Sequence, residues 1–267
     1  MPELPEVETI ARGLDPLVRG RVVTDVAVLW DRTVDARSMA LETLRGDAIE
    51  SVGRIGKFVA IRLRSGRALT IHLRMTGRLT VVKADATTPY ERLAFALDGG
   101  DKLSFADARK FGRARLLDEL SADALGVGID ALAKTLDGAA FTDIMRKRTT
   151  PVKTLLLDQK RIAGIGNIYA NEALFKARIR PRRPAGRLSA RERRALLSAL
   201  RRVLLRAIAS RGSSVDDYVD AEGLPGDFQK KLNVYGRAGL PCRRCRTPIK
   251  RIVLGQRGTF YCPACQR

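Results

Sequence analysis

Over its first 120 residues the chain alternates apolar and polar positions in short runs, after an initial helical stretch that ends near Leu14. Turn pairs such as Ser65-Gly66 and Gly99-Gly100 separate the runs, which is typical of strands joined by tight turns. We expect strands at 22–29, 57–63, 68–73, 79–82, 93–97, 102–105 and 113–117. The pattern therefore predicts a β-rich N-terminal domain with a leading helix, arranged as a sandwich.

From residue 121 onward the periodicity becomes helical, and it is clearest over 189–211. Ser189 and Glu192 have the spacing of a capping box, and Gly212 is a typical stop signal. The apolar positions repeat at helical spacing and form one stripe: Leu196, Leu197, Leu200, Val203, Leu204, Ala207 and Ile208. We therefore expect an amphipathic helix whose stripe is buried.

Composition adds a strong charge signal to this α+β pattern. The 267 residues suffice for two domains and a small module, and 50 Lys and Arg against 29 Asp and Glu give a net charge of +21. Such a charge attracts polyanions. No run approaches the roughly 18 consecutive apolar residues of a membrane span, and no signal peptide is visible. Nucleic acid is therefore the favoured partner, without a membrane.

All four cysteines lie between 242 and 267, as the pairs Cys242/Cys245 and Cys262/Cys265. This spacing is typical of one structural zinc ion with four thiolate ligands, and it leaves no open position for chemistry. The alternative is a pair of disulfides in a secreted protein, which the missing signal peptide disfavours. Between the pairs we expect strands at 251–254 and 259–262 around a Gly-Gln-Arg-Gly turn, with Arg257 at its tip.

A glycine-rich segment lies between two helical stretches, at Gly164-Ile165-Gly166-Asn167. Its glycines allow close backbone approach and can present N–H groups to a phosphate. A tight turn between helices needs glycines as well, so both interpretations remain open from the pattern alone.

Six motifs occur in order along the whole chain: PELPEVE at the N-terminus, Gly56-Lys57, HLRMTG at 72–77, DARKFG at 107–112, GIGNIYANEALF at 164–175 and the cysteine module. In this order and spacing the chain resembles the formamidopyrimidine-DNA glycosylase family. PELPEVE, QKKLNVYGRAG and QRGT resemble the branch that acts on oxidised purines. Arg74 stands where a glycine is common, and Ala108 where a proline is common.

The resemblance implies an α+β multidomain fold. Residues 1–120 would form the catalytic β-sandwich with its N-terminal helix, and 121–234 a helix-two-turns-helix domain with a lesion-capping loop. Residues 235–267 would form the zinc finger. It further implies a cytoplasmic, nucleoid-associated monomer that binds damaged double-stranded DNA.

The resemblance also implies that Met1 is removed and that the nitrogen of Pro2 is the nucleophile. A chain-terminal amine loses its proton near pH 8, against about 10.4 for lysine, and attack by a secondary amine yields an iminium. In an arbitrary protein Pro2 would be only a stiff terminal residue. Glu3 would act as general acid and base, and Lys57 would contact phosphate beside the lesion and assist catalysis.

Two further glutamates follow in the same stretch. Glu6 either orders the N-terminal helix through backbone amides or is an ordinary first-turn glutamate. Glu8 we expect at the surface.

A base inside the DNA stack must be flipped out before attack. The resemblance nominates Met75, Arg109 and Phe111 to fill the vacancy, although a lone Met or Phe is more often a core residue. Phosphate contacts would come from Asn167, Arg257 and Lys153 and from the glycine backbone at 164–166. His72 would either touch phosphate or be structural.

The expected activity is excision of 8-oxoguanine and formamidopyrimidines through a Schiff base, followed by strand cleavage by β,δ-elimination. Two rival interpretations remain. One is an endonuclease VIII-like enzyme for oxidised pyrimidines, and the other is a non-catalytic zinc-ribbon protein that binds damaged DNA.

Overall fold

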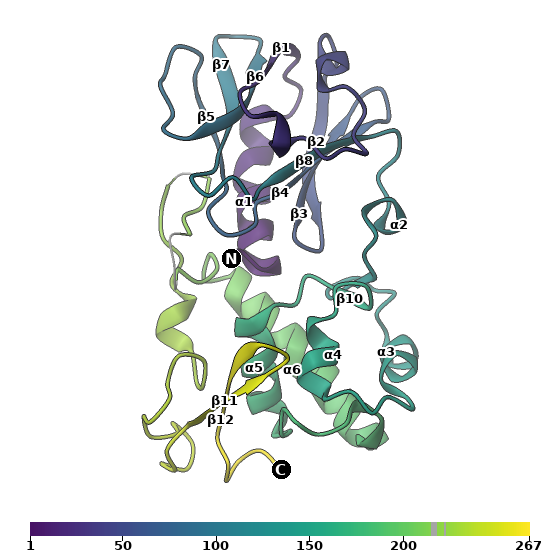
Figure 1. Cartoon of the computed structure of the whole chain (residues 1–267), viewed down its shortest axis with the longest axis vertical. Helices are drawn as coiled ribbons and strands as arrows, with labels where there is room; N and C mark the ends of the chain where they lie inside the picture. Colours follow the sequence, from purple (N-terminus) through teal and green to yellow (C-terminus); the bar gives the residue numbers. More distant parts are fainter. Residues whose placement is uncertain (215–217, 222) are drawn as a thin grey trace. The chain divides into compact units, whose positions relative to one another are not determined.

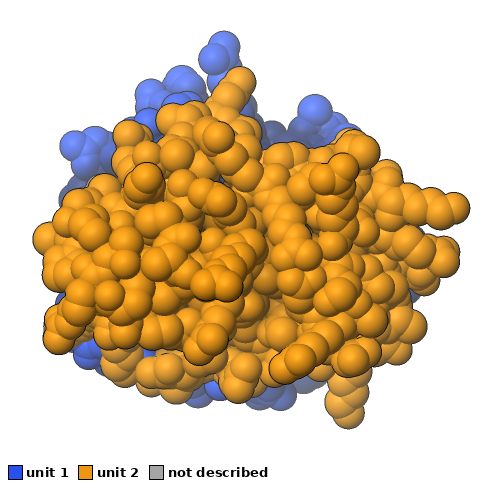
Figure 2. Space-filling view, turned by 90° about the horizontal axis from the view of Figure 1, so that it is seen from below, with its two compact units in different colours: residues 1–125, 210–227 blue, residues 126–209, 228–267 orange. Residues whose placement is uncertain are grey.

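The computed structural model describes residues 1–214, 218–221 and 223–267. The chain forms two compact units (Figures 1 and 2). Unit 1 comprises residues 1–125 and 210–227, and unit 2 comprises residues 126–209 and 228–267. Among the described residues, no helix combines the length and apolar content that a membrane crossing requires.

Unit 1 contains two four-stranded antiparallel sheets and the helix α1, Leu4–Val18. The first sheet has the order β1 (Val23–Val28), β6 (Glu91–Leu97), β7 (Asp101–Ala106) and β5 (Arg78–Lys83). The second has the order β2 (Ile49–Ile55), β3 (Phe58–Leu63), β4 (Ala68–His72) and β8 (Arg113–Leu117). Short helices η1 (Asp31–Thr33), η2 (Leu41–Leu44) and α2 (Ala122–Leu125) complete the unit.

One apolar cluster joins α1 to both sheets of unit 1, and it confirms the predicted sandwich. The helix contributes the face that carries Val7, Ile10, Leu14 and Val18, each almost fully buried. Strand β2 was not predicted, because its buried residues do not alternate and its pairing with β3 shifts by a bulge after Ile49.

Unit 2 is mainly helical (Figure 1). Its helices are α3 (Gly138–Met145), α4 (Val152–Leu157), α5 (Asn167–Ala177), α6 (Ala190–Ile208), η3 (Ala185–Arg187) and η4 (Phe228–Lys231). The short strands β9 (Ile129–Asp130) and β10 (Ile162–Ala163) pair in parallel. Helix α6 has the predicted capping box and buried stripe, except that Ile208 is only half-buried, and it ends at Ile208, three residues before the predicted end.

The C-terminal hairpin, β11 (Lys250–Leu254) and β12 (Arg257–Tyr261), belongs to unit 2 and runs along α5. The Asn167 side chain donates to the Gly258 carbonyl at 3.1 Å, and the Asn171 side chain accepts from the Phe260 N–H at 2.8 Å. One turn further along α5, Phe175 packs against Cys242 and Cys262. These contacts hold β12 and the following Cys262 against α5.

Candidate functional site

The N-terminal turn of α1 is buried and held by reciprocal hydrogen bonds. Pro2 is buried and Glu3 is only 4% exposed. The Glu3 carboxylate accepts the backbone N–H of Glu6, while the Glu6 carboxylate accepts the Glu3 N–H at 2.8 Å. The first residues of the chain therefore have a fixed geometry, as a reactive terminus requires.

Glu6 also connects this turn to the chain segment that returns from unit 2. Its Oε1 accepts the Ser213 N–H at 2.8 Å, and a Cβ on Gly212 would approach that oxygen to 2.9 Å. The Tyr218 hydroxyl donates to the Glu6 carbonyl at 3.4 Å, and burial together with the Glu6 charge raises the pKa of Tyr218. Glu6 therefore orders the helix start, the first of its two predicted roles.

Glu8, which we expected at the surface, is half-buried, with its side chain 20% exposed. Its carboxylate binds Arg12 and Arg54, each at 2.7 Å, and the Arg54 side chain is only 8% exposed. Arg54 also donates to the Gly56 carbonyl at 3.5 Å. This series of contacts connects the beginning of α1 to the turn that carries Lys57.

Lys57 lies in the two-residue turn between β2 and β3, where Ile55 pairs with Phe58. Gly56, the first turn residue, has φ +58°, which glycine adopts without strain. Lys57 is only 6% exposed, which is unusual for a lysine in a turn. This turn therefore carries a buried cation, and Arg54 connects the turn to Glu8 of α1.

His72, at the end of β4, pairs with Phe58 and contacts its ring edge-to-face at 4.7 Å between centroids. Burial, and then the charges of Arg74 and Lys57, lower the pKa of His72 to about 3, so the ring is neutral at physiological pH. Its Nδ1 accepts the Arg74 N–H at 3.0 Å, which leaves the ring proton on Nε2.

The predicted wedge residues lie on two segments that cross between the sheets. Segment 73–77 leads from β4 to β5, and segment 107–112 leads from β7 back to β8. Because β4 pairs with β8 and β5 pairs with β7, both crossings start from neighbouring strand ends and lie together. Met75 is 41% and Phe111 50% exposed, and the Arg109 guanidinium lies 5.2 Å from the centre of the Phe111 ring.

The carboxylate of Asp107 holds these two segments together. Asp107 is 1% exposed and accepts the Thr76 hydroxyl, the Arg109 N–H at 3.2 Å and the Gly112 N–H at 2.7 Å. Gly112 has no room for a side chain, since a Cβ would lie 2.4 Å from the Phe105 ring. We did not predict a role for Asp107 from the sequence. Its only signal there was its position at the start of the DARKFG motif.

Arg74, which stands where a glycine is common, has φ +56°. A left-handed conformation explains the preference for glycine at this position, because a side chain there is strained.

In unit 2 the glycine segment forms the entry to α5. Gly166 caps the helix in an extended conformation, and Gly164 has φ +99°. The side chain of Gln159 accepts the Gly164 N–H at 3.0 Å and donates to the Ile165 carbonyl at 2.7 Å. The segment is thus both a tight turn between helices and a helix N-terminus.

Lys153 is fully buried beside this entry. Its ammonium donates to the Gly258 carbonyl at 3.0 Å and to the Thr259 hydroxyl at 2.7 Å. Lys153 therefore supports the hairpin from inside unit 2.

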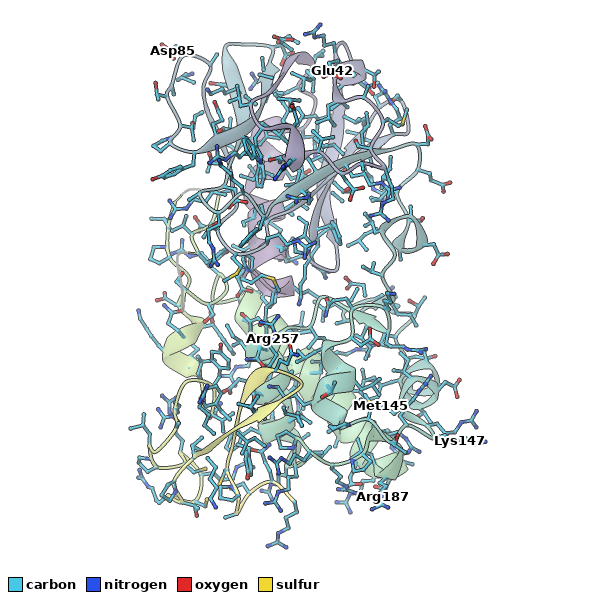
Figure 3. The ribbon with its side chains drawn as sticks, in the orientation of Figure 1. Glu42, Asp85, Met145, Lys147, Arg187 and Arg257 are labelled. Carbon is cyan, nitrogen blue, oxygen red and sulfur yellow. The ribbon has the colours of Figure 1, made fainter. Side chains whose placement is uncertain are left out.

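Arg257 is exposed and begins β12, where it pairs with Leu254 (Figure 3). The hairpin turn consists of Gly255 and Gln256, with φ +55° and +58°. Two central residues with positive φ are typical of a type I′ turn. The predicted four-residue turn was therefore too long, and Arg257 lies beside the tip.

The sulfur atoms of Cys242, Cys245, Cys262 and Cys265 all lie within 4.8 Å of one another, and no disulfide joins them. Four thiolates at about 2.3 Å from a tetrahedral zinc ion need sulfur separations of this size. The N–H groups of Arg244 and Cys265 each point at a cysteine sulfur, at 3.4 Å. The donor set fits zinc and confirms the predicted structural site.

Three family models match successive stretches of the chain. Residues 1–114 match the formamidopyrimidine-DNA glycosylase N-terminal domain, 127–219 its H2TH domain, and 239–267 the zinc finger found in FPG and IleRS. The formamidopyrimidine-DNA glycosylase of Chloroflexus aggregans is 47% identical over 271 residues, covering 100% of this chain and 98% of the relative. The chain belongs to the formamidopyrimidine-DNA glycosylase family.

Solved structures agree with this assignment to the formamidopyrimidine-DNA glycosylases. The MutM (FPG) protein from Thermus thermophilus is similar with a TM-score of 0.89 and 42% identity, over 99% of this chain and 98% of that one. Lactococcus lactis Fpg in complex with DNA containing an abasic site has a TM-score of 0.89 and 32% identity, over 99% of each chain. The predicted fold class is confirmed.

Proposed function

We propose that this protein excises 8-oxoguanine and formamidopyrimidines from duplex DNA and then cuts the strand as an abasic-site lyase. It is a base-excision-repair DNA glycosylase by family. The Lactococcus lactis relative has been solved with DNA containing Fapy-dG and with DNA containing an abasic site. The observation that carries the proposal is the buried turn in which Pro2 directly precedes the buried carboxyl group of Glu3.

In the proposed reaction, removal of Met1 frees the secondary amine of Pro2, which attacks C1′ of the damaged nucleotide. The bond between C1′ and the base breaks, and the base leaves with the proton that the Pro2 nitrogen loses. Glu3, which later recovers a proton, gives one to the sugar ring oxygen as the C1′–O4′ bond opens, and C1′ remains doubly bonded to the Pro2 nitrogen. The resulting iminium withdraws electrons and makes the C2′ proton acidic. Its removal expels the 3′ phosphate, and a second elimination expels the 5′ phosphate.

Lys57 would meet the negative charge next to the lesion. Its low exposure means that little water screens the ammonium, so its attraction to a phosphate is stronger than at the surface. His72 would donate its Nε2–H to a neighbouring phosphate, since its Nδ1 already accepts from Arg74. A neutral histidine can make that bond without a change of protonation.

Met75, Arg109 and Phe111 would fill the space that the flipped nucleotide leaves. Two apolar side chains exclude water from the opened stack, and a guanidinium can donate to the acceptor edge of the unpaired base. Their exposure and their common edge of unit 1 support this role.

Unit 2 would grip the DNA backbone through Asn167, the glycine backbone at 164–166, where the Gly164 N–H already donates to Gln159, and Arg257. Helix N-termini bind phosphate because their N–H groups are unpaired and carry partial positive charge. When bound, zinc holds the two cysteine pairs together and so fixes the hairpin that presents Arg257. We propose a monomer that acts on DNA in the bacterial cytoplasm.

Incubation with two duplexes tests the proposed specificity. One carries 8-oxoguanine opposite cytosine and the other carries thymine glycol, with the same flanking sequence. We expect release of 8-oxoguanine, strand cuts on both sides of the lost nucleoside, and little action on thymine glycol. Preference for thymine glycol would assign the endonuclease VIII-like activity instead, and tight binding without release of either base would assign a non-catalytic binding protein.

A further inference from the structure

Helix α5 and strand β12 run together and define two opposite ends of this part of unit 2. Asn167 and Arg257 lie at one end, where Asn167 contacts Gly258. The 11 residues of α5 span about 16 Å, and the five residues of β12 span a similar length. The last turn of α5 and the zinc cysteines therefore lie at the other end, away from the proposed phosphate grip.

This second end is strongly basic. The segments 173–180, 199–209, 239–250 and 262–267 together contain eleven Lys and Arg residues and no Asp or Glu. Lys176, in the last turn of α5, lies close enough to three of these charged residues to interact with them electrostatically. Burial lowers the pKa of Lys176, and the like charges of Arg202, Arg206 and Arg244 lower it further. Lys176 and three arginines from α6 and the first cysteine pair therefore lie close together.

A hollow of about 360 Å³ lies within this region, beside two of the zinc ligands, and is lined by Arg178, Arg244 and Arg267. The Arg244 guanidinium packs on the Phe175 ring at 4.9 Å, and the Arg178 carbonyl accepts the Arg267 N–H at 3.2 Å. Among the described residues, none of the three arginines forms a salt bridge with a carboxylate. They are exposed cations on ordered backbone without an anionic partner.

We propose that this end of unit 2 is a second DNA-binding surface, which holds the backbone of an undamaged duplex while the active site holds another DNA segment. Duplex DNA carries one negative charge per about 1.7 Å, and guanidinium groups bind phosphate with two parallel hydrogen bonds. The cations come from two helices and both cysteine knuckles, and so extend beyond the single hollow that one carboxylate would occupy. A continuous polyanion fits this extended distribution better than a short acidic peptide.

Two DNA surfaces would let the protein pass directly from one DNA segment to another. A protein with a single surface must dissociate first, so its departure rate does not depend on competing DNA. With two surfaces, the competitor binds before the first segment leaves. The departure rate then rises with the concentration of competitor, and this dependence is a measurable signature of the second surface.

The test compares two full-length triple variants with equal loss of charge. The first carries Arg178→Gln, Arg202→Gln and Arg244→Gln. The control carries Arg37→Gln, Arg45→Gln and Lys83→Gln, exposed positions of unit 1 whose charges already pair with aspartates. Zinc content is measured for each protein, since Arg244 lies between two ligands.

Release of a labelled duplex with a tetrahydrofuran abasic analogue is followed at rising concentrations of unlabelled undamaged duplex. We expect the rate to rise with competitor for the wild type and the control, and to stay constant for the first variant. Excision of 8-oxoguanine in a single turnover should stay within about twofold in all three. A wild-type rate independent of competitor, or a first variant that behaves like the wild type, would overturn the proposal.

Salt dependence and an acidic polymer provide two further readouts. Loss of three phosphate contacts should flatten the log–log salt dependence of transfer by about 3. Binding of poly-glutamate, measured separately, distinguishes the other source of negative charge. If the first variant loses poly-glutamate binding but still transfers between duplexes, the surface belongs to an acidic protein segment and the DNA proposal is wrong.

Discussion

Replacement of Asp107 by alanine should impair the insertion of the wedge residues Met75, Arg109 and Phe111 into DNA and leave the chemical steps intact. The carboxylate is buried and holds Thr76, the Arg109 N–H and the Gly112 N–H, so it joins both crossing segments. Of these bonds only that of Gly112 is itself buried. Alanine removes this acceptor from all three donors, although the Arg109 N–H keeps a long bond to the Thr76 hydroxyl oxygen at 3.4 Å, and it frees the loop that carries Arg109 and Phe111.

The size of the effect follows from these environments. A buried hydrogen bond to a carboxylate contributes about 1.5–3 kcal/mol, whereas water can replace the two partly buried bonds, at about 0.5–1 kcal/mol each. The bonds share one carboxylate and are not additive, so we expect a loss of about 3 kcal/mol in the free energy of unfolding of unit 1. If half of this energy orders the loops for insertion, kcat/KM on duplex DNA falls about tenfold.

Two abasic substrates show whether Asp107 acts on the wedge. Duplex DNA must be opened and its vacancy filled, but a single-stranded abasic oligonucleotide has no opposite base and little stacking. Asp107→Ala should therefore lose activity on the duplex and retain it on the single strand, at a temperature well below its Tm. Fluorescence of 2-aminopurine beside the lesion should report less opening of the stack.

Two variants serve as controls for this prediction. Asp85→Ala removes an exposed aspartate from the β5–β6 loop (Figure 3) and should change neither substrate. Asp107→Asn keeps one acceptor oxygen and should give an intermediate loss. Equal losses of Asp107→Ala on duplex and single strand, or no loss on either, would refute the reasoning.

Three further predictions concern the buried groups and the metal. His72 has a depressed pKa of about 3 in the folded protein, so the free energy of unfolding of the wild type should fall by up to about 1.4 kcal/mol per pH unit below pH 6.5. His72→Gln should lack this contribution. The same pH dependence of the free energy of unfolding in both proteins, measured with urea from pH 7 to 4.5, would contradict the assignment. Lys153→Met should lower Tm through the loss of two buried hydrogen bonds but leave the salt dependence of DNA binding unchanged, and a slope reduced by about one would show instead that Lys153 meets phosphate. Cys262→Ser should lose zinc and weaken DNA binding at least tenfold, and unchanged affinity in the metal-free protein would show that the hairpin is not needed.

The sequence predicted the sandwich, the long helix α6 and the zinc hairpin because each has a strong local signal. It failed at β2, where a bulge removes the alternation on which strand prediction depends. It also missed Asp107, because its importance comes from three partners up to 31 residues away along the chain. These three bonds form because the two segments that cross between the sheets lie together, and no local sequence pattern indicates them.

The positions of buried charges were equally hard to predict. The burial of Lys153 has no local sequence signal, because lysine is normally exposed and its contacts with the hairpin come from residues more than 100 positions further along the chain. Glu8 was expected at the surface, and it is half-buried where it pairs with the nearly buried Arg54. The resemblance identified which residues to consider, and the structure shows which contacts these residues make within the protein.

The central claim is that the nitrogen of Pro2 forms a covalent bond with C1′ of the damaged nucleotide. Borohydride reduction during the reaction with an 8-oxoguanine duplex, followed by digestion and mass spectrometry, tests this most directly. We predict one protein–DNA adduct, located on a peptide that begins at Pro2 and absent both from Pro2→Gly and from protein that retains Met1. An adduct on a lysine, or excision of the base without any trapped species, would contradict the account.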